Sequence, residues 1–181
     1  MSYKNQGFRR LPKLALIAAV VAGAVLPTGW LPQAKAQHAD HIVISEVYGG
    51  GGNSGSHYKN DFIELYNPTS TPVSLNGWSV QYGSAKGTGA WQKSSLTGTI
   101  APYGFYLVKQ AAGTGGTAEL PAPDDTGTLN LSGTEGKVAL VRSGTVLTGT
   151  DVSSPDIVDL VGFGAANAYE GAAPAPATTA S

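Results

Sequence analysis

The chain has 181 residues, a formal net charge of -1, 25 glycines and no cysteine. The lack of cysteine excludes disulfides, cysteine-ligated zinc, iron–sulfur clusters and cysteine nucleophiles, and the near-neutral charge excludes a general attraction to nucleic acids or anionic membranes. With 41% hydrophobic and 13% charged residues, the high glycine count is typical of a turn-rich β protein.

The first 36 residues have the composition of a secretory signal. They carry five basic residues and no acidic residue, and the apolar run Leu14–Leu26 follows the basic start. This run is shorter than the roughly 20 residues that a membrane-spanning helix needs. The small residues of Ala34-Lys35-Ala36 suit a signal peptidase, so we expect cleavage between Ala36 and Gln37. The alternative is an uncleaved N-terminal anchor.

Cleavage at this position would separate two segments of opposite charge. Residues 1–36 have a charge of +5, whereas residues 37–181 contain six basic and twelve acidic residues, a charge of -6. We therefore predict a secreted, extracellular protein with a signal peptide at 1–36, one domain at 37–171 and an Ala/Pro/Thr-rich tail or linker at 172–181. No membrane span is expected after cleavage. Without disulfides, the apolar core must hold the domain together.

Short segments of β type recur along the mature chain, each bounded by glycine, proline or asparagine. The first two expected strands, Ile42–Tyr48 and Asp61–Asn67, flank a glycine-rich segment, Gly49–Ser56, which we expect to be a flexible loop. Pro68 ends the second strand because proline lacks the amide proton that a sheet requires. The other expected strands are Val73–Tyr82, Trp91–Ile100, Phe105–Lys109, Thr128–Leu131, Lys137–Arg142 and Ile157–Val161.

This pattern predicts an all-β fold. No helical stretch connects the strands, as a parallel α/β sheet would require, and many short strands between turn residues favour an antiparallel sandwich or barrel. Trp78 supplies a large apolar surface, and we expect its indole ring to cover the open end of the sandwich. We expect Gly77 to permit a close approach of the backbone beside it.

Several segments that occur in a characteristic order carry a resemblance to a known family. They are Ile44–Val47, Asp61–Asn67, Leu75–Trp78, Ile100–Gly104, Gly136–Leu140 and Asp156–Gly164. With this series, residues 41–176 resemble the lamin-tail domain in the form found in secreted bacterial proteins. The resemblance implies an immunoglobulin-like antiparallel β-sandwich and a non-catalytic module. Such modules often accompany exported nucleases or phosphatases of the endonuclease/exonuclease/phosphatase type, and they usually continue into a closing strand.

Three acidic residues on the first two expected strands form a candidate metal site. They are Glu46, Asp61 and Glu64. Carboxylates from adjacent strands could converge on Ca²⁺ or Mg²⁺, because both ions prefer oxygen ligands. The alternative is that these side chains point to solvent or accept hydrogen bonds from the amides of residues 49–60. We favour the alternative and expect no metal and no cofactor.

The residue types that other catalytic sites need are poorly placed in this chain. Gly49–Gly52 lacks the Gly-Lys-Ser/Thr sequence and the following helix of a phosphate-binding loop. All three histidines precede residue 58, and the Gly-x-Ser-x-Gly motif of serine hydrolases is absent. The acidic residues are scattered, so no glycosidase-type pair is marked out. We predict no catalytic residues and no enzymatic activity.

The six basic residues of the mature segment are spread singly along it, so direct binding of nucleic acid is not expected. We predict a secreted, non-catalytic module for interaction or targeting, whose partner is a protein or a cell-surface component. The strand edges and the glycine-rich loop are the expected contact surfaces, and the edges would also allow a dimer. The alternative is the N-terminal module of an exported nuclease or phosphatase whose catalytic domain is absent from this chain.

Overall fold

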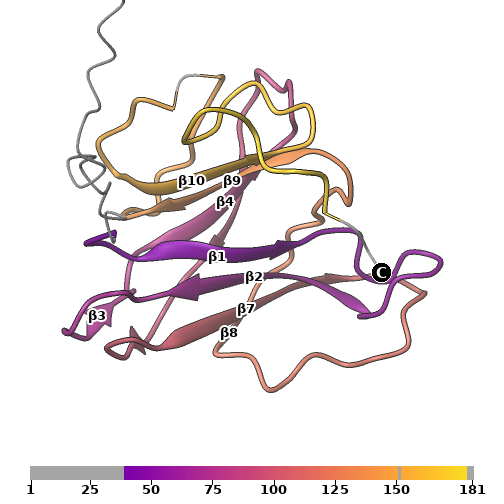
Figure 1. The fold of residues 1–181 in the computed structure, drawn as a ribbon, viewed down its shortest axis with the longest axis horizontal. Helices are drawn as coiled ribbons and strands as arrows, with labels where there is room; N and C mark the ends of the chain where they lie inside the picture. Colours follow the sequence, from indigo (N-terminus) through magenta and orange to yellow (C-terminus); the bar gives the residue numbers. More distant parts are fainter. Residues whose placement is uncertain (1–38, 151, 179–181) are drawn as a thin grey trace, which may run out of the picture. The chain divides into compact units, whose positions relative to one another are not determined.

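A computed structural model describes residues 39–150 and 152–178, and it contains strands and loops in this part of the chain (Figure 1). The predicted signal peptide and its cleavage site at Ala36 and Gln37 lie outside the described residues. No helix in the described part is long and apolar enough to cross a membrane. The strands are β1 Val43–Tyr48, β2 Asn60–Tyr66, β3 Val73–Ser74, β4 Ser79–Gly83, β5 Gln92–Ser95, β6 Thr99–Ile100, β7 Phe105–Ala112, β8 Asp125–Thr126, β9 Gly136–Val141 and β10 Ile157–Phe163.

These strands form two four-stranded sheets that pack face to face. The first sheet has the order β1-β2-β7-β8 and the second has the order β10-β9-β4-β5, while β3 and β6 form a separate pair. Among the named strands, every pair is antiparallel except β7 and β8. The predicted all-β, immunoglobulin-like antiparallel β-sandwich is therefore confirmed.

The main core lies between the two sheets and follows from the alternation of side chains along each strand. On β2, Ile63 and Leu65 point into the core and have no exposed surface. Val80 of β4 and Leu140 of β9 meet them from the second sheet and are equally buried. Apolar burial of this kind is the main term that stabilises a domain without disulfides.

A second apolar cluster covers the outer face of the second sheet. Ala139 and Val141 of β9 pack there with Trp91, with Leu147 from the β9–β10 connection and with Leu160. Because β9 is covered on both faces, all six of its residues are buried. This explains why the sequence of β9 is apolar without a strict alternation.

Two expected strands have the wrong extent. Val73–Tyr82 is divided into β3 and β4 by a turn at Gly77, whose φ angle is 83°. A Cβ atom at Gly77 would meet no atom within 4 Å. The positive φ angle therefore requires glycine here, and the expected close approach is wrong. Trp91–Ile100 is divided into β5 and β6 by a second turn, in which Gly98 has a φ angle of 71°.

The expected strand Thr128–Leu131 is also wrong, because the strand in this region is the short β8. The amides of Leu129 and Leu131 donate hydrogen bonds to side chains and not to a neighbouring strand. The acceptors are the side-chain oxygens of Gln110, at 2.9 Å, and of Asp61, at 2.7 Å. Both leucine side chains are buried, and their spacing of two residues is also the apolar pattern of a strand.

The segment after β10 lies against the sandwich, in yellow in Figure 1. The amide of Ala175 donates to the carbonyl of Gly162 at 2.8 Å, and the carbonyl of Ala175 accepts from Gly164 at 2.9 Å. Further along, the Thr178 hydroxyl donates to the carbonyl of Gly133 at 3.0 Å. Part of the segment 172–181, which the composition assigned to a tail or linker, therefore contacts the domain.

Candidate functional site

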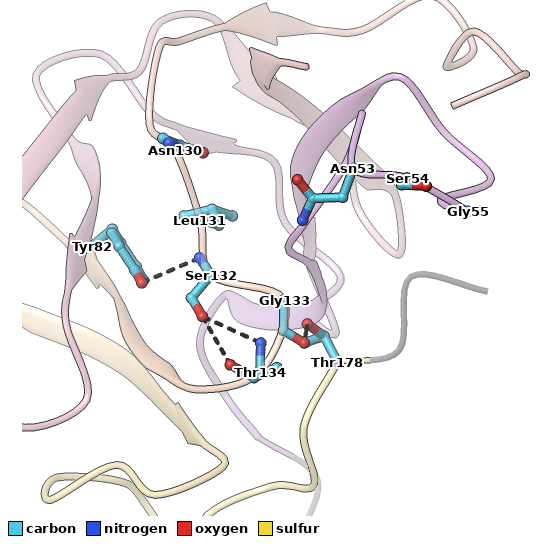
Figure 2. Close-up of a pocket in the computed structure, with 10 residues that line it drawn as sticks. All are labelled: Asn53, Ser54, Gly55, Tyr82, Asn130, Leu131, Ser132, Gly133, Thr134 and Thr178. Atoms are coloured by element: carbon cyan, nitrogen blue, oxygen red, sulfur yellow. Dashed lines mark hydrogen bonds between the residues drawn. The ribbon is translucent and has the colours of Figure 1, made fainter. Parts of the chain in front are cut away.

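An open hollow of about 840 Å³ lies at the end of the sandwich where the β1–β2 loop meets the segment before β9 (Figure 2). We call it the loop pocket. It is formed by the tip of the β1–β2 loop, the segment 130–134, the Tyr82 side chain of β4 and the end of the described chain. The residues that line it are Asn53, Ser54, Gly55, Tyr82, Asn130, Leu131, Ser132, Gly133, Thr134 and Thr178.

The base of the β1–β2 loop is packed, so the expectation of a flexible loop is wrong for Gly49–Gly52. All four glycines are buried. The amide of Gly50 donates to the carbonyl of Leu131 at 3.2 Å. A Cβ atom on Gly51 would lie 2.1 Å from the carbonyl carbon of Asn60, so a larger residue does not fit at this position. The glycines therefore permit close packing, and within Gly49–Ser56 the exposed residues are those of the tip, 53–55.

Asp61 joins the base of the β1–β2 loop to the segment before β9. Its side chain is 1% exposed, and its carboxylate accepts one hydrogen bond from the amide of Gly51 at 2.6 Å and another from that of Leu131 at 2.7 Å. Burial raises the pKa of Asp61, although the hydrogen bonds from the amides of Leu131, Gly51 and Gly50 oppose this rise. Asp61 thus has a structural role, as an acceptor for amides that otherwise lack partners.

The candidate metal ligands are divided between the two faces of the first sheet. Asp61 lies on the same face of β2 as the core residue Ile63, whereas Glu64 lies on the opposite face. Glu46 pairs directly with Glu64 across β1 and β2, so these two share the outer face. Burial raises the pKa of Glu46, and the charge of Glu64 raises it further. Within residues 39–150 and 152–178, no group of three acidic or histidine side chains could hold a metal ion.

Hydrogen bonds fix the segment 130–134 at the edge of the loop pocket. The Tyr82 hydroxyl accepts a hydrogen bond from the amide of Ser132 at 3.2 Å, as Figure 2 shows. The Ser132 hydroxyl oxygen in turn accepts from the amides of Thr134 at 3.2 Å and Glu135 at 3.3 Å. Burial raises the pKa of Tyr82, so its hydroxyl remains neutral around pH 7. The pocket wall is therefore ordered by its own internal bonds.

The lining of the loop pocket is polar and neutral. Its side chains carry amides and hydroxyls, together with the apolar surface of Leu131 and the ring of Tyr82, and no lysine, arginine, aspartate, glutamate or histidine lines it. Such a surface donates and accepts hydrogen bonds without attracting a charged ligand. Sequence reasoning named the glycine-rich loop as a contact surface but missed the segment 130–134, because it placed residues 128–131 in a strand.

A buried lysine on β9 forms a separate polar cluster. Lys137 has no exposed surface, and its Nζ atom donates to Oδ1 of Asn167 at 2.9 Å and to the carbonyl of Gly87 at 3.4 Å. The same Nζ atom lies 5.2 Å from the ring centroid of Trp91, in a cation–π contact. Burial lowers the pKa of Lys137. The hydrogen bond from Lys137 to Asn167 therefore joins the segment after β10 to the sheet.

A family model matches most of the sandwich. Residues 35–155 match the family model for the Lamin Tail Domain, which covers more than half of the chain. No curated protein sequence matches the chain. The matched range includes β1 to β9, and with them the β1–β2 loop and the segment 130–134 that form most of the loop pocket.

Proposed function

The chain belongs to the lamin-tail domain family, and from this premise we propose that it is an exported, non-catalytic module that binds a protein or a cell-surface component. Lamin-tail domains are immunoglobulin-like, non-catalytic domains, and function in such folds resides in particular sites on the scaffold. The loop pocket is the contact site in this proposal.

The observation that carries the proposal is the neutral, hydrogen-bonding lining of the loop pocket. Amide and hydroxyl groups pair with the polar groups of a ligand, and neighbouring apolar surface adds burial. The packed glycines and the Asp61 carboxylate hold this lining in place before a ligand arrives. Such preorganisation favours binding because little conformational entropy is then lost.

Export is the second part of the proposal, and it is supported by the leader sequence. The basic start, the apolar run and the small residues before Gln37 together match a secretory signal. N-terminal sequencing of protein collected from the culture medium should begin at Gln37. Detection of residues 1–36 on that protein would contradict cleavage.

The binding role is tested with the labelled chain and the cell-envelope fraction of the producing organism. We expect saturable binding, and we expect the double variant Asn53→Ala, Asn130→Ala to bind about thirtyfold more weakly, since each of the two lost hydrogen bonds contributes about 1 kcal/mol. Both side chains are exposed at the pocket. The matched control is Gln92→Ala, an exposed amide on β5 outside the pocket.

Two results would contradict the proposal. One is a lack of saturable binding, or equal binding by the chain and the double variant. The other is hydrolysis of DNA or of a phosphoester substrate with Mg²⁺ above the level of a heat-treated control, because it would show catalysis. That second result would favour an exported hydrolase.

A further inference from the structure

The outer face of the first sheet, away from the loop pocket, carries exposed aromatic side chains. Tyr66 of β2 and Phe105 of β7 are direct partners across the sheet, and their ring centroids are 4.8 Å apart. Phe105 is 61% exposed, and so is Tyr103 at the turn that leads into β7. We call Tyr66 and Phe105 the aromatic patch. Exposed aromatic rings that lie together commonly mark an interaction site.

Tyr103 has a backbone conformation that disfavours its side chain. Its φ angle is 54°, and among the described residues it is the one non-glycine residue with a positive φ angle. A residue held in this region costs of order 1–3 kcal/mol. The amide of Tyr103 donates to the carbonyl of Thr69 at 3.2 Å, which holds the turn in place. Because its ring is mostly exposed, burial of the ring does not offset this strain.

Two carboxylates lie beside the aromatic patch on the same face. Glu46 and Glu64 are directly opposite each other, and Glu64 precedes Tyr66 by two positions on β2, a separation of about 7 Å along the strand. Like charges in this arrangement destabilise a sheet. In the described part of the chain, neither carboxylate forms an ion pair with lysine, arginine or histidine. The Ser45 hydroxyl donates to Glu64 Oε1 at 2.8 Å and orients it.

We propose that this face binds a protein segment that carries lysine or arginine side chains. In such a complex a cation from the partner would neutralise the Glu46–Glu64 pair, and the apolar stem of its side chain would cover the rings of Tyr66 and Phe105. Charge complementarity selects this partner, since residues 37–181 have a charge of -6 and would repel nucleic acid and anionic lipid. This face is separate from the loop pocket, so the inference goes beyond the proposed function and gives the module a second contact surface.

The test uses four synthetic peptides, in which glycine alternates with lysine, arginine, serine or glutamate. Each peptide is titrated into the isotopically labelled chain, and the amide signals of the chain are followed by NMR. We expect the lysine and arginine peptides to shift amide signals of β1, β2 and β7, with affinity that falls as salt rises from about 50 to 300 mM, because exposed charges are screened. The serine and glutamate peptides should bind at least about tenfold more weakly, a difference of about 1.4 kcal/mol.

Variants separate the contributions of charge and ring. Glu46→Gln with Glu64→Gln, and separately Phe105→Ser, should each weaken binding of the lysine peptide about fivefold or more, which is about 1 kcal/mol. Glu119→Gln is the control, because this carboxylate is exposed and pairs with Lys59 away from the face. All these side chains are at least partly exposed, and thermal unfolding of each variant checks that the fold is retained.

Three outcomes would overturn the inference. They are equal binding of serine and lysine peptides, binding that the glutamine variants leave unchanged, and binding of a neutral oligosaccharide that requires Phe105 but not the carboxylates. The Asn53→Ala, Asn130→Ala variant should bind the lysine peptide normally. Failure of the peptide titration would therefore leave the envelope-binding result intact. Failure of envelope binding by the unmodified chain would likewise leave the peptide titration intact.

Discussion

Replacing Asp61 by asparagine should destabilise the domain more than any other single change of a polar side chain at the loop pocket. The carboxylate accepts amide hydrogen bonds at 2.6 and 2.7 Å from two segments that are 10 and 70 residues away in the chain. Asparagine has one acceptor oxygen, so its NH₂ group would face one of these amides. Because Asp61 is 1% exposed, water does not readily replace the lost acceptor.

The expected loss follows from these contacts. An unsatisfied buried amide costs about 1–3 kcal/mol, and the remaining hydrogen bond is weaker because its acceptor is no longer charged. Together we expect the free energy of unfolding to fall by about 3 kcal/mol, or the melting temperature by about 10 °C for a domain of this size. Urea unfolding of the chain and of Asp61→Asn measures the difference at neutral pH.

Site-specific hydrogen exchange shows whether the reasoning about Asp61 is correct. The amides of Gly51 and Leu131 should exchange much faster in Asp61→Asn, whereas amides in the centre of β9 should be affected only through global stability. The exposed carboxylate Glu119, changed to glutamine, serves as the control and should alter stability by less than about 0.5 kcal/mol. A loss below about 0.5 kcal/mol in Asp61→Asn would refute the assigned role.

Three further changes should alter stability in urea or thermal unfolding. Glu46→Gln should raise the free energy of unfolding by about 0.2–1 kcal/mol at pH 7, because it removes repulsion from Glu64. Burial raises the folded pKa of Glu46 above 4.5, so the free energy of unfolding of the unmodified chain falls as pH rises through that pKa. The stability difference between Glu46→Gln and the unmodified chain should therefore be absent at low pH and grow as pH rises. A difference that does not change with pH would contradict this. Gly77→Ala should cost about 1–2 kcal/mol through its positive φ angle, and an unchanged midpoint would contradict that role. Lys137→Ala should cost about 3 kcal/mol, because it leaves a cavity and an unpaired Asn167 oxygen, whereas a loss below about 1 kcal/mol would show that the cluster is dispensable.

The fold was accessible from the sequence wherever local pattern decides structure. Alternating apolar residues located β1 and β2 to within one residue at each end, and the turn residue Pro68 correctly ended β2. The apolar residues of Thr128–Leu131 led to a wrong strand prediction. Leu129 and Leu131 belong to a loop, in which their side chains are buried and their amides donate hydrogen bonds to side chains. No local pattern distinguishes such a segment from a strand.

The candidate site was less accessible, because long-range contacts form it. Asp61 and Leu131 are 70 residues apart in the chain, and no spacing rule links them. Glycine suggests flexibility in Gly49–Gly52, but in the folded chain the same lack of a side chain lets these residues pack against neighbouring backbone. The face that holds Glu64 could be inferred from the period of β2. The period of β1 would place Glu46 with the core residue Ile44, and only the irregularity between Ile44 and Glu46 brings it opposite Glu64 on the outer face.

The proposed binding role is tested most directly by one comparison of affinities on the cell-envelope fraction. The labelled chain should bind saturably, Gln92→Ala should bind with the same dissociation constant, and the Asn53→Ala, Asn130→Ala variant should show a dissociation constant about thirtyfold higher, as expected for the loss of two hydrogen bonds of about 1 kcal/mol each. Equal dissociation constants for all three proteins, with every variant folded, would contradict the role of the loop pocket.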